Sequence, residues 1–337
     1  MTKRKVMLYP PTLNWDFLKQ TPQQISEQFA NNGYDVIFCN NEQSNKPVEE
    51  VYPHVYVYHN FKDVLNKIKH KQLKVDIFYY TWAKSAQYVE NINAKINIYN
   101  RVDEFPDWAS YEQEAMDKAD IIFTTSQKLY TKTQESKPTY FIRNACPDSY
   151  IERNSNVPEE YRNVDGPIVM FSGAIGSWIS TSLIKKVADK YKTFLVGQEF
   201  GKHCPDNVIN LGVKTHDELH AYYQHANVSL IPFILKDGIT QSSCPLKLFE
   251  AMASGTLSVA TKWEETAIYP DAVLTAESDE EFLSQVDKAI QLSINNKEQV
   301  AEITKETAKK NTWEVRYKQI EKAIEEYALK SGVAIGS

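Results

Sequence analysis

The residues with the clearest chemical purpose lie between Ser243 and Gly255. This stretch predicts a helix in which Ser243 is the cap, Pro245 takes the first helical position and Gly255 provides a left-handed end. Lys247 and Glu250 then share one face, because positions three apart are neighbours on a helix. A cation in the first turn is unfavourable beside the positive end of the helix dipole, unless an anion lies against both. The pattern indicates a phosphate site in which Glu250, one turn later, could accept hydrogen bonds from sugar hydroxyls.

This segment resembles the nucleotide-sugar helix of GT-B type glycosyltransferases, which are built from two Rossmann-like domains. The residues that carry the resemblance are Pro245, Lys247, Glu250, Ala253 and Gly255. Three further segments look like the same family in the same order. They are Trp15-Asp16-Phe17-Leu18 with Gln23-Gln24, Val102-Asp103-Glu104-Phe105, and the run from Phe171 to Trp178. Several motifs in order are more specific than any one of them, and the most similar variety is the bacterial cell-surface polysaccharide enzymes of the teichuronic acid and exopolysaccharide kind.

The resemblance implies that the second half of the chain binds the nucleotide sugar. A glycine turn opens this half after a predicted strand, and backbone without side chains can approach a diphosphate closely there. The turn carries no Lys or Arg, so Lys247 must supply most of the charge that the phosphates require. In the resembled family, backbone near Val213 reads the edge of the base. The predicted donor-binding residues are Gly173, Gly176, Trp178, Val213, Lys247 and Glu250.

Two carboxylates follow the predicted strand that ends near Val102. Transfer to a hydroxyl with inversion requires a carboxylate that takes the acceptor proton, and Asp103 is the predicted base. Glu104 is the alternative base, or the partner that positions Asp103. A carboxylate that merely caps the next turn explains Asp103 equally well. Related retaining enzymes place a second Glu eight positions before Glu250, where this chain has Ser242, so inversion is favoured over retention.

Aromatic and polar residues after two other predicted strands could bind the acceptor. Trp15 and Asp16 follow the first strand, where an aromatic face could stack on a sugar ring and a carboxylate could bind its hydroxyls. A surface loop that packs on its own aromatic residues is the alternative. Arg143 and Asn144 end the last strand of the first half, where they could bind hydroxyls or tie down the backbone at a hinge, and the structural role is preferred.

The histidines do not predict a metal site. His203, His216, His220 and His225 are spaced 13, 4 and 5 residues apart, and only His216 and His220 are expected on one helix, partly solvated. Catalytic zinc needs three convergent protein ligands. We therefore expect no metal and no cofactor. The nucleotide sugar is a substrate, and the helix dipole with Lys247 can neutralise the departing diphosphate without a divalent ion.

The elements that must position these residues alternate between strand and helix, which predicts an α/β fold of parallel strands covered by helices. The resemblance implies two Rossmann-like domains that face each other across a cleft. We expect an acceptor domain at residues 1–150, a nucleotide-sugar domain at 166–312, and a C-terminal helix at 313–337 that packs back on the first domain. A polar linker is expected from Pro147 to Gly166, and a loop from Ile234 to Ser242 is expected to cover the donor.

Composition limits the classes of partner. The length of 337 residues exceeds what one core usually serves, and the net charge of -6 argues against nucleic acid. Lys3, Arg4 and Lys5 could touch an anionic membrane, although a solvated terminus is the preferred interpretation. No apolar run approaches the roughly 18 residues that span a bilayer. Scattered cysteines without a signal peptide are typical of a cytoplasmic protein, so we expect the chain there or peripherally at the inner face of the membrane.

Together these features predict a metal-independent, hexosyltransferase-like glycosyltransferase. It would move a sugar from a nucleotide-diphosphate donor, with UDP as the expected nucleotide, to a hydroxyl of a cell-surface polysaccharide or lipid-linked precursor of a bacterial cell envelope. The alternatives are a nucleotide-sugar epimerase and a non-catalytic sugar-nucleotide-binding subunit of a polysaccharide assembly complex. A nicotinamide oxidoreductase is less favoured, because Pro10-Pro11 stands where a Gly-x-Gly-x-x-Gly motif would follow the first strand.

Overall fold

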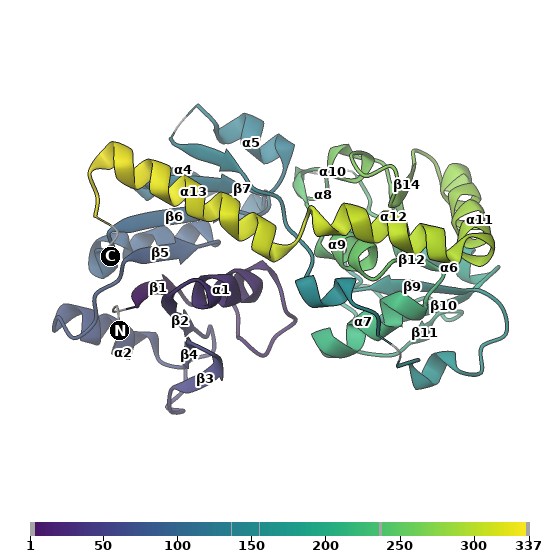
Figure 1. Ribbon diagram of the computed structural model, residues 1–337, viewed down its shortest axis with the longest axis horizontal. Coiled ribbons are helices and arrows are strands. Elements are labelled where there is room, and N and C mark those ends of the chain that lie inside the picture. The colour runs from purple at the N-terminus through teal and green to yellow at the C-terminus, as the bar shows by residue number, and fades with distance from the viewer. Residues whose placement is uncertain (1–3, 136, 155, 236–237, 335–337) are drawn as a thin grey trace. The chain divides into compact units, whose positions relative to one another are not determined.

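The computed structural model describes residues 4–135, 137–154, 156–235 and 238–334. Their contacts divide the chain into two α/β units (Figure 1). The first unit comprises Met1–Arg143, Ser242–Cys244 and Trp313–Ser337, and the second comprises Asn144–Gln241 and Pro245–Thr312. The chain therefore enters the second unit after Arg143 rather than at residue 150. The expected linker folds with the second unit and includes the short helices η3 (Asp148–Ile151) and η4 (Glu159–Tyr161).

A mostly parallel sheet forms the centre of the first unit. Its strands lie in the order β3-β4-β2-β1-β5-β6-β7-β8. Their bounds are β1 Lys5–Tyr9, β2 Tyr34–Cys39, β3 Glu49–Tyr52, β4 Val55–Tyr58, β5 Ile77–Tyr80, β6 Ile96–Arg101, β7 Ile121–Thr124 and β8 Thr139–Phe141. Adjacent strands are parallel except for β3 with β4. The sequence analysis did not predict β3, because this edge strand is polar and mostly exposed and lacks the apolar signal of the others.

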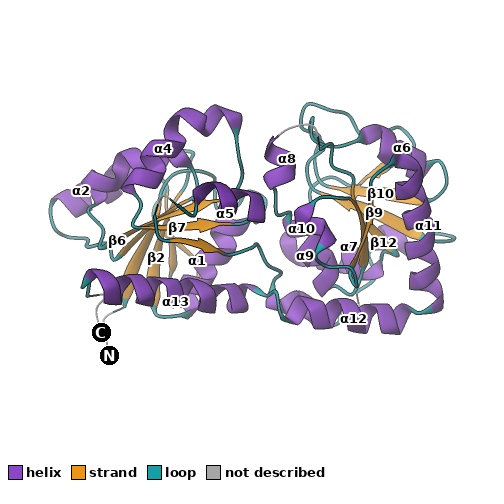
Figure 2. Cartoon of the chain, turned by 90° about the horizontal axis from the view of Figure 1, so that it is seen from above, coloured by secondary structure: helices purple, strands orange, loops and turns teal. Residues whose placement is uncertain are grey.

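Helices cover both faces of this sheet (Figure 2). α1 (Thr21–Asn31) and α13 (Trp313–Ser331) lie together on one face, where the Phe29 ring meets Tyr317 edge to face at 5.2 Å. α2 (Phe61–Lys69) and α4 (Ala109–Lys118) cover the other face. The shorter helices are η1 (Ala83–Tyr88), α3 (Val89–Ile92), η2 (Pro106–Trp108) and α5 (Gln127–Thr133). Because the sheet is covered twice, inner strands such as β5 and β7 are buried along their whole length.

A fully parallel sheet forms the centre of the second unit. Its strands lie in the order β11-β10-β9-β12-β13-β14. Their bounds are β9 Ile168–Ser172, β10 Lys192–Val196, β11 Ile209–Asn210, β12 Val228–Ile231, β13 Leu257–Thr261 and β14 Val273–Ala276. The chain adds β10 and β11 on one side of β9 and then places β12 on the other side. The junction of β9 and β12 is therefore a topological switch point, and ligands of such sheets bind beyond the carboxyl ends of the strands there.

The helices of the second unit also form two layers. α6 (Thr181–Ala188) and α11 (Asp279–Asn295) pack on one face, and α7 (His216–His225) and α9 (Leu246–Ala253) pack on the other. α12 (Lys297–Lys309) packs against α9. α8 (Gly238–Ser242) and α10 (Glu264–Ala267) are short. The layers hold α7 and α9 side by side, which brings together residues far apart in the sequence.

The predicted start of α9 was wrong. Pro245 is the N-cap residue, with an extended ψ of 129°, so neither Ser243 as the cap nor Pro245 as the first helical residue holds. The φ of -71° at Pro245 suits a cap residue as well as a first helical residue, so the type of the residue alone does not decide where the helix begins. The predicted end is confirmed, because Gly255 has a φ of +83° and a β-carbon there would lie 3.0 Å from Ala301 of α12.

Candidate functional site

A lysine and two aromatic rings meet at the switch point of the second sheet. Gly173 directly follows β9, and Phe233 lies just beyond β12. The Lys247 ammonium on α9 lies over the Phe171 ring, 4.4 Å from its centroid, and 5.5 Å from the centroid of Phe233. The structure therefore brings the first turn of α9 to the ligand-binding edge of the sheet.

The Lys247 side chain is only partly exposed. Desolvation lowers its pKa from 10.5 to about 8, while the charge of Glu250 acts in the opposite direction. Its Nζ lies 3.0 Å from the point that a β-carbon on Gly173 would occupy. An anion at this edge would replace the solvation that the ammonium has lost.

Glycines occupy three neighbouring strand ends in this unit. The Gly173 N–H donates to the Val196 carbonyl at 3.0 Å, and the Gly197 N–H donates to the Gly212 carbonyl at 2.9 Å. A β-carbon on Gly197 would overlap the Gly173 carbonyl, so the two loops pack backbone against backbone. Val213 follows Gly212 and is 52% exposed, so its side chain does not belong to the core. The N–H groups of Gly173, Gly197 and Gly212 therefore all donate within the protein, the last of them to the Asn210 side chain at 2.9 Å.

Two aromatic rings lie beside the glycine turns. Trp178 folds back over Gly176, where any side chain would overlap the indole. The Ile175 N–H donates to Gln198 at 2.9 Å and the Phe200 N–H donates to Ile175 at 2.8 Å, so the loops after β9 and β10 are joined. Phe200 is 62% exposed and its ring lies 5.9 Å from that of Trp178. Phe200 and Gly197 are not among the predicted donor-binding residues, although they lie beside them.

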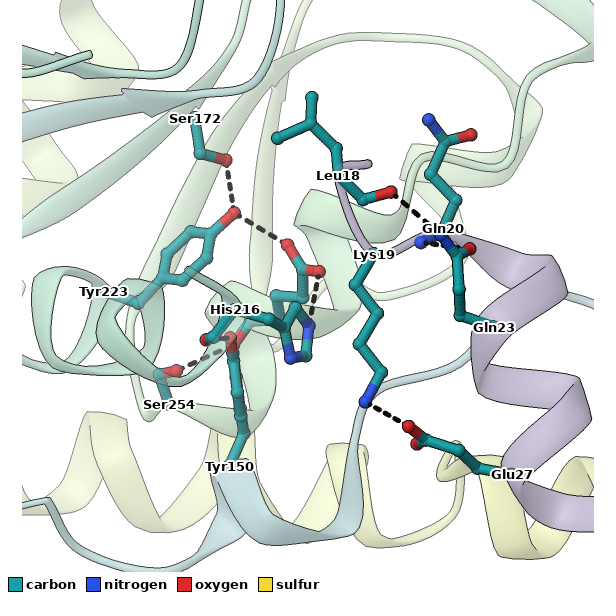
Figure 3. A network of polar contacts seen from close by, with 11 residues as sticks. Leu18, Lys19, Gln20, Gln23, Glu27, Tyr150, Ser172, His216, Tyr223 and Ser254 are labelled. Carbon is teal, nitrogen blue, oxygen red and sulfur yellow. Dashed lines mark hydrogen bonds and ion pairs between the residues drawn. The ribbon is translucent and has the colours of Figure 1, made fainter. Parts of the chain in front are cut away.

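Glu250 lies one turn after Lys247, and it is only 7% exposed. Its Oε2 accepts a hydrogen bond from the Tyr223 phenol at 3.1 Å, and its Oε1 lies 3.3 Å from His216 Nε2. Figure 3 labels Tyr223 and His216, and dashed lines join them to this carboxylate, which carries no label. The Tyr223 phenol also bonds to the Ser172 hydroxyl. Both carboxylate oxygens therefore have protein partners, which the sequence analysis did not predict.

The expected solvation of the histidine pair on α7 was wrong for His220. His220 is 7% exposed, and the Tyr150 ring stacks on it at 4.5 Å and on His216 at 4.8 Å. Burial lowers the pKa of His220 to about 4, so this imidazole is neutral at physiological pH. Among the residues that the structure describes, no group of three or more His, Cys, Asp or Glu side chains could hold a metal ion.

The two candidate bases differ in their surroundings. Asp103 follows β6, and burial raises the pKa of its carboxyl group to about 7. Glu104 forms an ion pair with Lys132 at 2.5 Å. Burial raises the pKa of Glu104, but the hydrogen bond and charge of Lys132 outweigh it and lower the pKa overall. A general base works best with a pKa near the working pH, so this comparison favours Asp103.

Comparison with known proteins bears on these residues. Residues 177–291 match the family model described as Glycosyl transferases group 1. Sucrose-phosphate synthase from Thermosynechococcus elongatus is 15% identical with a TM-score of 0.74, over 96% of this chain and 98% of that chain. The chain has the GT-B fold. HepE from Anabaena in complex with UDP is 12% identical with a TM-score of 0.68, over 96% of this chain and 100% of that chain. OtsA, a trehalose-6-phosphate synthase, is 10% identical with a TM-score of 0.71, over 95% and 98%.

These GT-B structures confirm the predicted fold class of two Rossmann-like α/β units. The matched family model covers the segment from Ser177 to Gln291, which contains Trp178, Val213, Lys247 and Glu250. No curated protein sequence matches the chain. The predicted donor-binding residues therefore lie within the matched segment or shortly before it.

The predicted acceptor residues of the first GT-B unit have different settings. The Trp15 ring packs edge to face on Phe38 at 5.1 Å, and the backbone N–H of Trp15 donates to the Asn40 side chain at 2.9 Å. Gln23 Nε2 donates to the Trp15 carbonyl at 3.3 Å, and Figure 3 shows Gln23 at the start of α1. Asp16 is exposed. The loop after β1 is therefore anchored at Trp15 and open at Asp16.

The division of the chain into units falls between Arg143 and Asn144. The Arg143 guanidinium stacks on the Phe141 ring at 4.1 Å, and the backbone carbonyl of Arg143 accepts a hydrogen bond from Arg316 Nε at 3.1 Å. Asn144 is buried, with 8% exposed. These contacts agree with the structural role that the sequence analysis preferred.

The loop expected from Ile234 to Ser242 is partly helical, because α8 occupies its second half. The Thr240 hydroxyl donates to the Ile234 carbonyl at 2.8 Å, and the Ser242 hydroxyl accepts from the Glu104 N–H at 3.3 Å. Residues 236–237 of this loop lie outside the described residues.

The expected basic start of the chain is not a free cluster. Arg4 forms an ion pair with Asp35 at 3.1 Å and also donates to the Tyr34 carbonyl at 2.7 Å. Lys5 is part of β1 and lies 5.6 Å from the centroid of the Tyr34 ring, and Lys3 lies outside the described residues. No helix in the described part of the chain has the length and apolar character that crossing a membrane requires.

Proposed function

We propose that this chain is a glycosyltransferase that moves a sugar from a UDP-sugar to a hydroxyl of a saccharide acceptor. The observation that carries the proposal is the Lys247 ammonium, desolvated between Phe171 and Phe233 at the switch point and directly beside Gly173. The match of residues 177–291 to Glycosyl transferases group 1 supports it, and UDP is bound in the similar HepE structure.

The leaving diphosphate is the group that this site would stabilise. Lys247 and the N-terminus of α9 would neutralise the charge that develops on the diphosphate as the glycosidic bond breaks. These groups do not strictly need help from a divalent ion, so we propose metal-independent transfer. Gly173 would let the phosphates approach the backbone beside Lys247, while Val213 and Trp178, which covers Gly176, would border the rest of the donor.

Asp103 would act as the general base of an inverting transfer. Its carboxylate would take the proton of the acceptor hydroxyl, whose oxygen then attacks the anomeric carbon as the diphosphate leaves. A pKa raised by burial to about 7 suits this role. Ser242 stands where related retaining enzymes carry a second Glu, which also favours inversion.

The acceptor that we propose is a cell-surface polysaccharide or its lipid-linked precursor, on the strength of the sequence resemblance. Such an acceptor would be used in the cytoplasm, with peripheral contact at the inner face of the membrane. Trp15 and Asp16 are the residues of the first unit best suited to it, because Asp16 is exposed beside an anchored aromatic ring.

The test is release of UDP by the full chain from a panel of UDP-sugars, with and without saccharide acceptors and with and without EDTA. We expect one UDP-sugar to raise the melting temperature selectively, and UDP release to require an acceptor and to survive EDTA. Lys247→Ala should abolish turnover while the chain stays folded. Binding without release on any acceptor would instead favour the non-catalytic subunit.

A further inference from the structure

The Glu250 carboxylate is held by two side chains of the neighbouring helix. Tyr223 and His216, both on α7, contact separate oxygens of the carboxylate at 3.1 and 3.3 Å (Figure 3). Glu250 is 7% exposed and Tyr223 is completely buried. A long side chain that could otherwise sample several rotamers is therefore restricted to one orientation.

Tyr223 connects Glu250 to the end of β9. Its phenol lies between the Glu250 carboxylate and the hydroxyl of Ser172, the residue that precedes Gly173. Burial raises the pKa of Tyr223 well above its ordinary value, and the charge of Glu250 raises it further. The phenol therefore keeps its proton and remains a donor to the carboxylate.

His216 is oriented by Tyr150. The Tyr150 ring stacks on the His216 imidazole at 4.8 Å with 28° between the ring planes, and the Tyr150 phenol donates to the His216 carbonyl. A carboxylate can only accept hydrogen bonds, so the contact with Glu250 requires a proton on His216 Nε2. The stack sets the plane of the ring, and the contact with the carboxylate places a proton on Nε2.

We infer that Tyr223 and His216 are positioning residues, which hold Glu250 so that its remaining lone pairs accept hydrogen bonds from a vicinal diol of the donor. A carboxylate offers about four lone-pair sites, and the two protein donors leave two of them for adjacent hydroxyls. The diol would belong either to the ribose of the nucleotide or to the transferred sugar. The inference rests on the proposed function, in which Glu250 contacts the donor.

The same helix supplies a matched control for Tyr223. The Tyr222 phenol also bonds to a carboxylate, Glu160, at 3.0 and 2.9 Å. Tyr222→Phe therefore removes the same type of hydrogen bond one residue away, without a contact to Glu250. For His216, Gln can replace the Nε2 donor, whereas Phe keeps a flat ring for Tyr150 and loses the donor.

Calorimetric titration of the full chain with UDP, 2′,3′-dideoxy-UDP and UDP-glucose tests the inference. If the diol is that of the ribose, the affinity for UDP should fall about tenfold in Tyr223→Phe and His216→Phe, because the ribose hydroxyls lose a hydrogen bond to a charged group. Dideoxy-UDP lacks these hydroxyls, so its affinity should stay within about twofold. If the diol is on the transferred sugar, the loss should appear with UDP-glucose and not with UDP. His216→Gln should restore most of the affinity, and Tyr222→Phe should bind all three ligands like the wild type.

Equal losses for UDP and dideoxy-UDP would overturn the inference, since the two side chains would then act through general stability. Unchanged affinity for both UDP and UDP-glucose in Tyr223→Phe and His216→Phe would overturn it as well. A wild-type chain that binds neither UDP nor UDP-glucose would overturn the proposed function for a UDP donor, which separates the two failures.

Discussion

The ammonium of Lys247 lies 3.0 Å from the point that a β-carbon on Gly173 would occupy. The two residues come from different elements, because Gly173 follows β9 and Lys247 stands in the first turn of α9. Gly173 also has a φ of +106°, which other residues rarely adopt. The glycine therefore turns the chain at the switch point and leaves the space that the cation occupies.

Gly173→Ala should weaken UDP binding about tenfold or more, because the added methyl group displaces Nζ and a charged contact is lost. The positive φ should also cost about 1–2 kcal/mol in the free energy of unfolding. Calorimetry with UDP measures the first effect and urea denaturation the second.

Gly33→Ala is the control for backbone strain. Gly33 has a φ of +90°, but nothing lies within 4 Å of the point that its β-carbon would occupy. It should lose a similar free energy of unfolding and bind UDP like the wild type. If both variants lose affinity equally, the contact between Gly173 and Lys247 has no part in binding.

The lowered pKa of Lys247 predicts that UDP binding depends on pH. The free side chain is charged below a pKa of about 8 and neutral above it. A bound diphosphate stabilises the ammonium, so the complex keeps the proton to a higher pH. The affinity should be nearly constant below the pKa and fall above it by up to about tenfold per pH unit, as measured from about pH 7 to about pH 9.

Lys247→Met is the control for this titration. It keeps an unbranched side chain of similar length without the charge, so UDP should bind more weakly and the pH dependence should disappear. A wild-type affinity that does not change over the same range would exclude Lys247 as the group that carries the charge.

Much of the fold could be predicted from the sequence. Strands of a sheet that is covered twice are apolar on both faces, so runs such as Ile121–Thr124 are visible without a structure. The polar edge strand β3 and the short helix α8 have no such signal. The start of α9 was misplaced because Ser243 and Pro245 form a plausible cap by residue type alone.

The site was predictable only where a residue conflicts with its local setting. Lys247 is such a residue, because a cation near the positive end of the helix dipole is unfavourable unless an anion lies beside it. Tyr223 and His216 fit their helix without conflict and reach Glu250 only because the sheet places α7 beside α9. No pattern within α7 or α9 alone predicts that pairing.

Loss of Glu112 should destabilise the first unit. The Arg101 guanidinium pairs with Glu112 at 2.9 Å, both side chains are buried, and the Tyr99 phenol donates to the same carboxylate at 2.8 Å. Glu112→Ala leaves a buried charge uncompensated, which should cost about 3–5 kcal/mol in urea denaturation.

Glu114→Ala is the matched variant on the same helix. Glu114 pairs with Lys118 at 2.9 Å, but its side chain is 49% exposed. Removal of such a surface pair should cost less than about 1 kcal/mol. Similar small costs for Glu112→Ala and Glu114→Ala would mean that the buried pair does not hold the end of β6.

Asp103→Asn should lower kcat by about two to four orders of magnitude while the affinity for UDP stays unchanged, because a general base acts only on the transfer step. Burial raises the pKa of Asp103 to about 7. The carboxylate must be ionised to accept a proton, so kcat/KM of the wild type should rise as pH passes through about 7. It should fall again above about 8, where the free Lys247 side chain loses its charge. Product formation across this range, together with calorimetry, measures both effects.

Glu104→Gln tests whether the neighbouring carboxylate is the base instead. Glu104 is paired with Lys132 and its pKa is lowered overall, so it is a weak proton acceptor and its loss should change kcat only a few-fold. A large loss in Glu104→Gln with normal turnover in Asp103→Asn would reverse the assignment. NMR of the product then decides the mechanism, because a base at the acceptor hydroxyl implies an inverted anomeric configuration. Retention would exclude Asp103 as the base even if Asp103→Asn is inactive, since the carboxylate would then act by positioning the substrate.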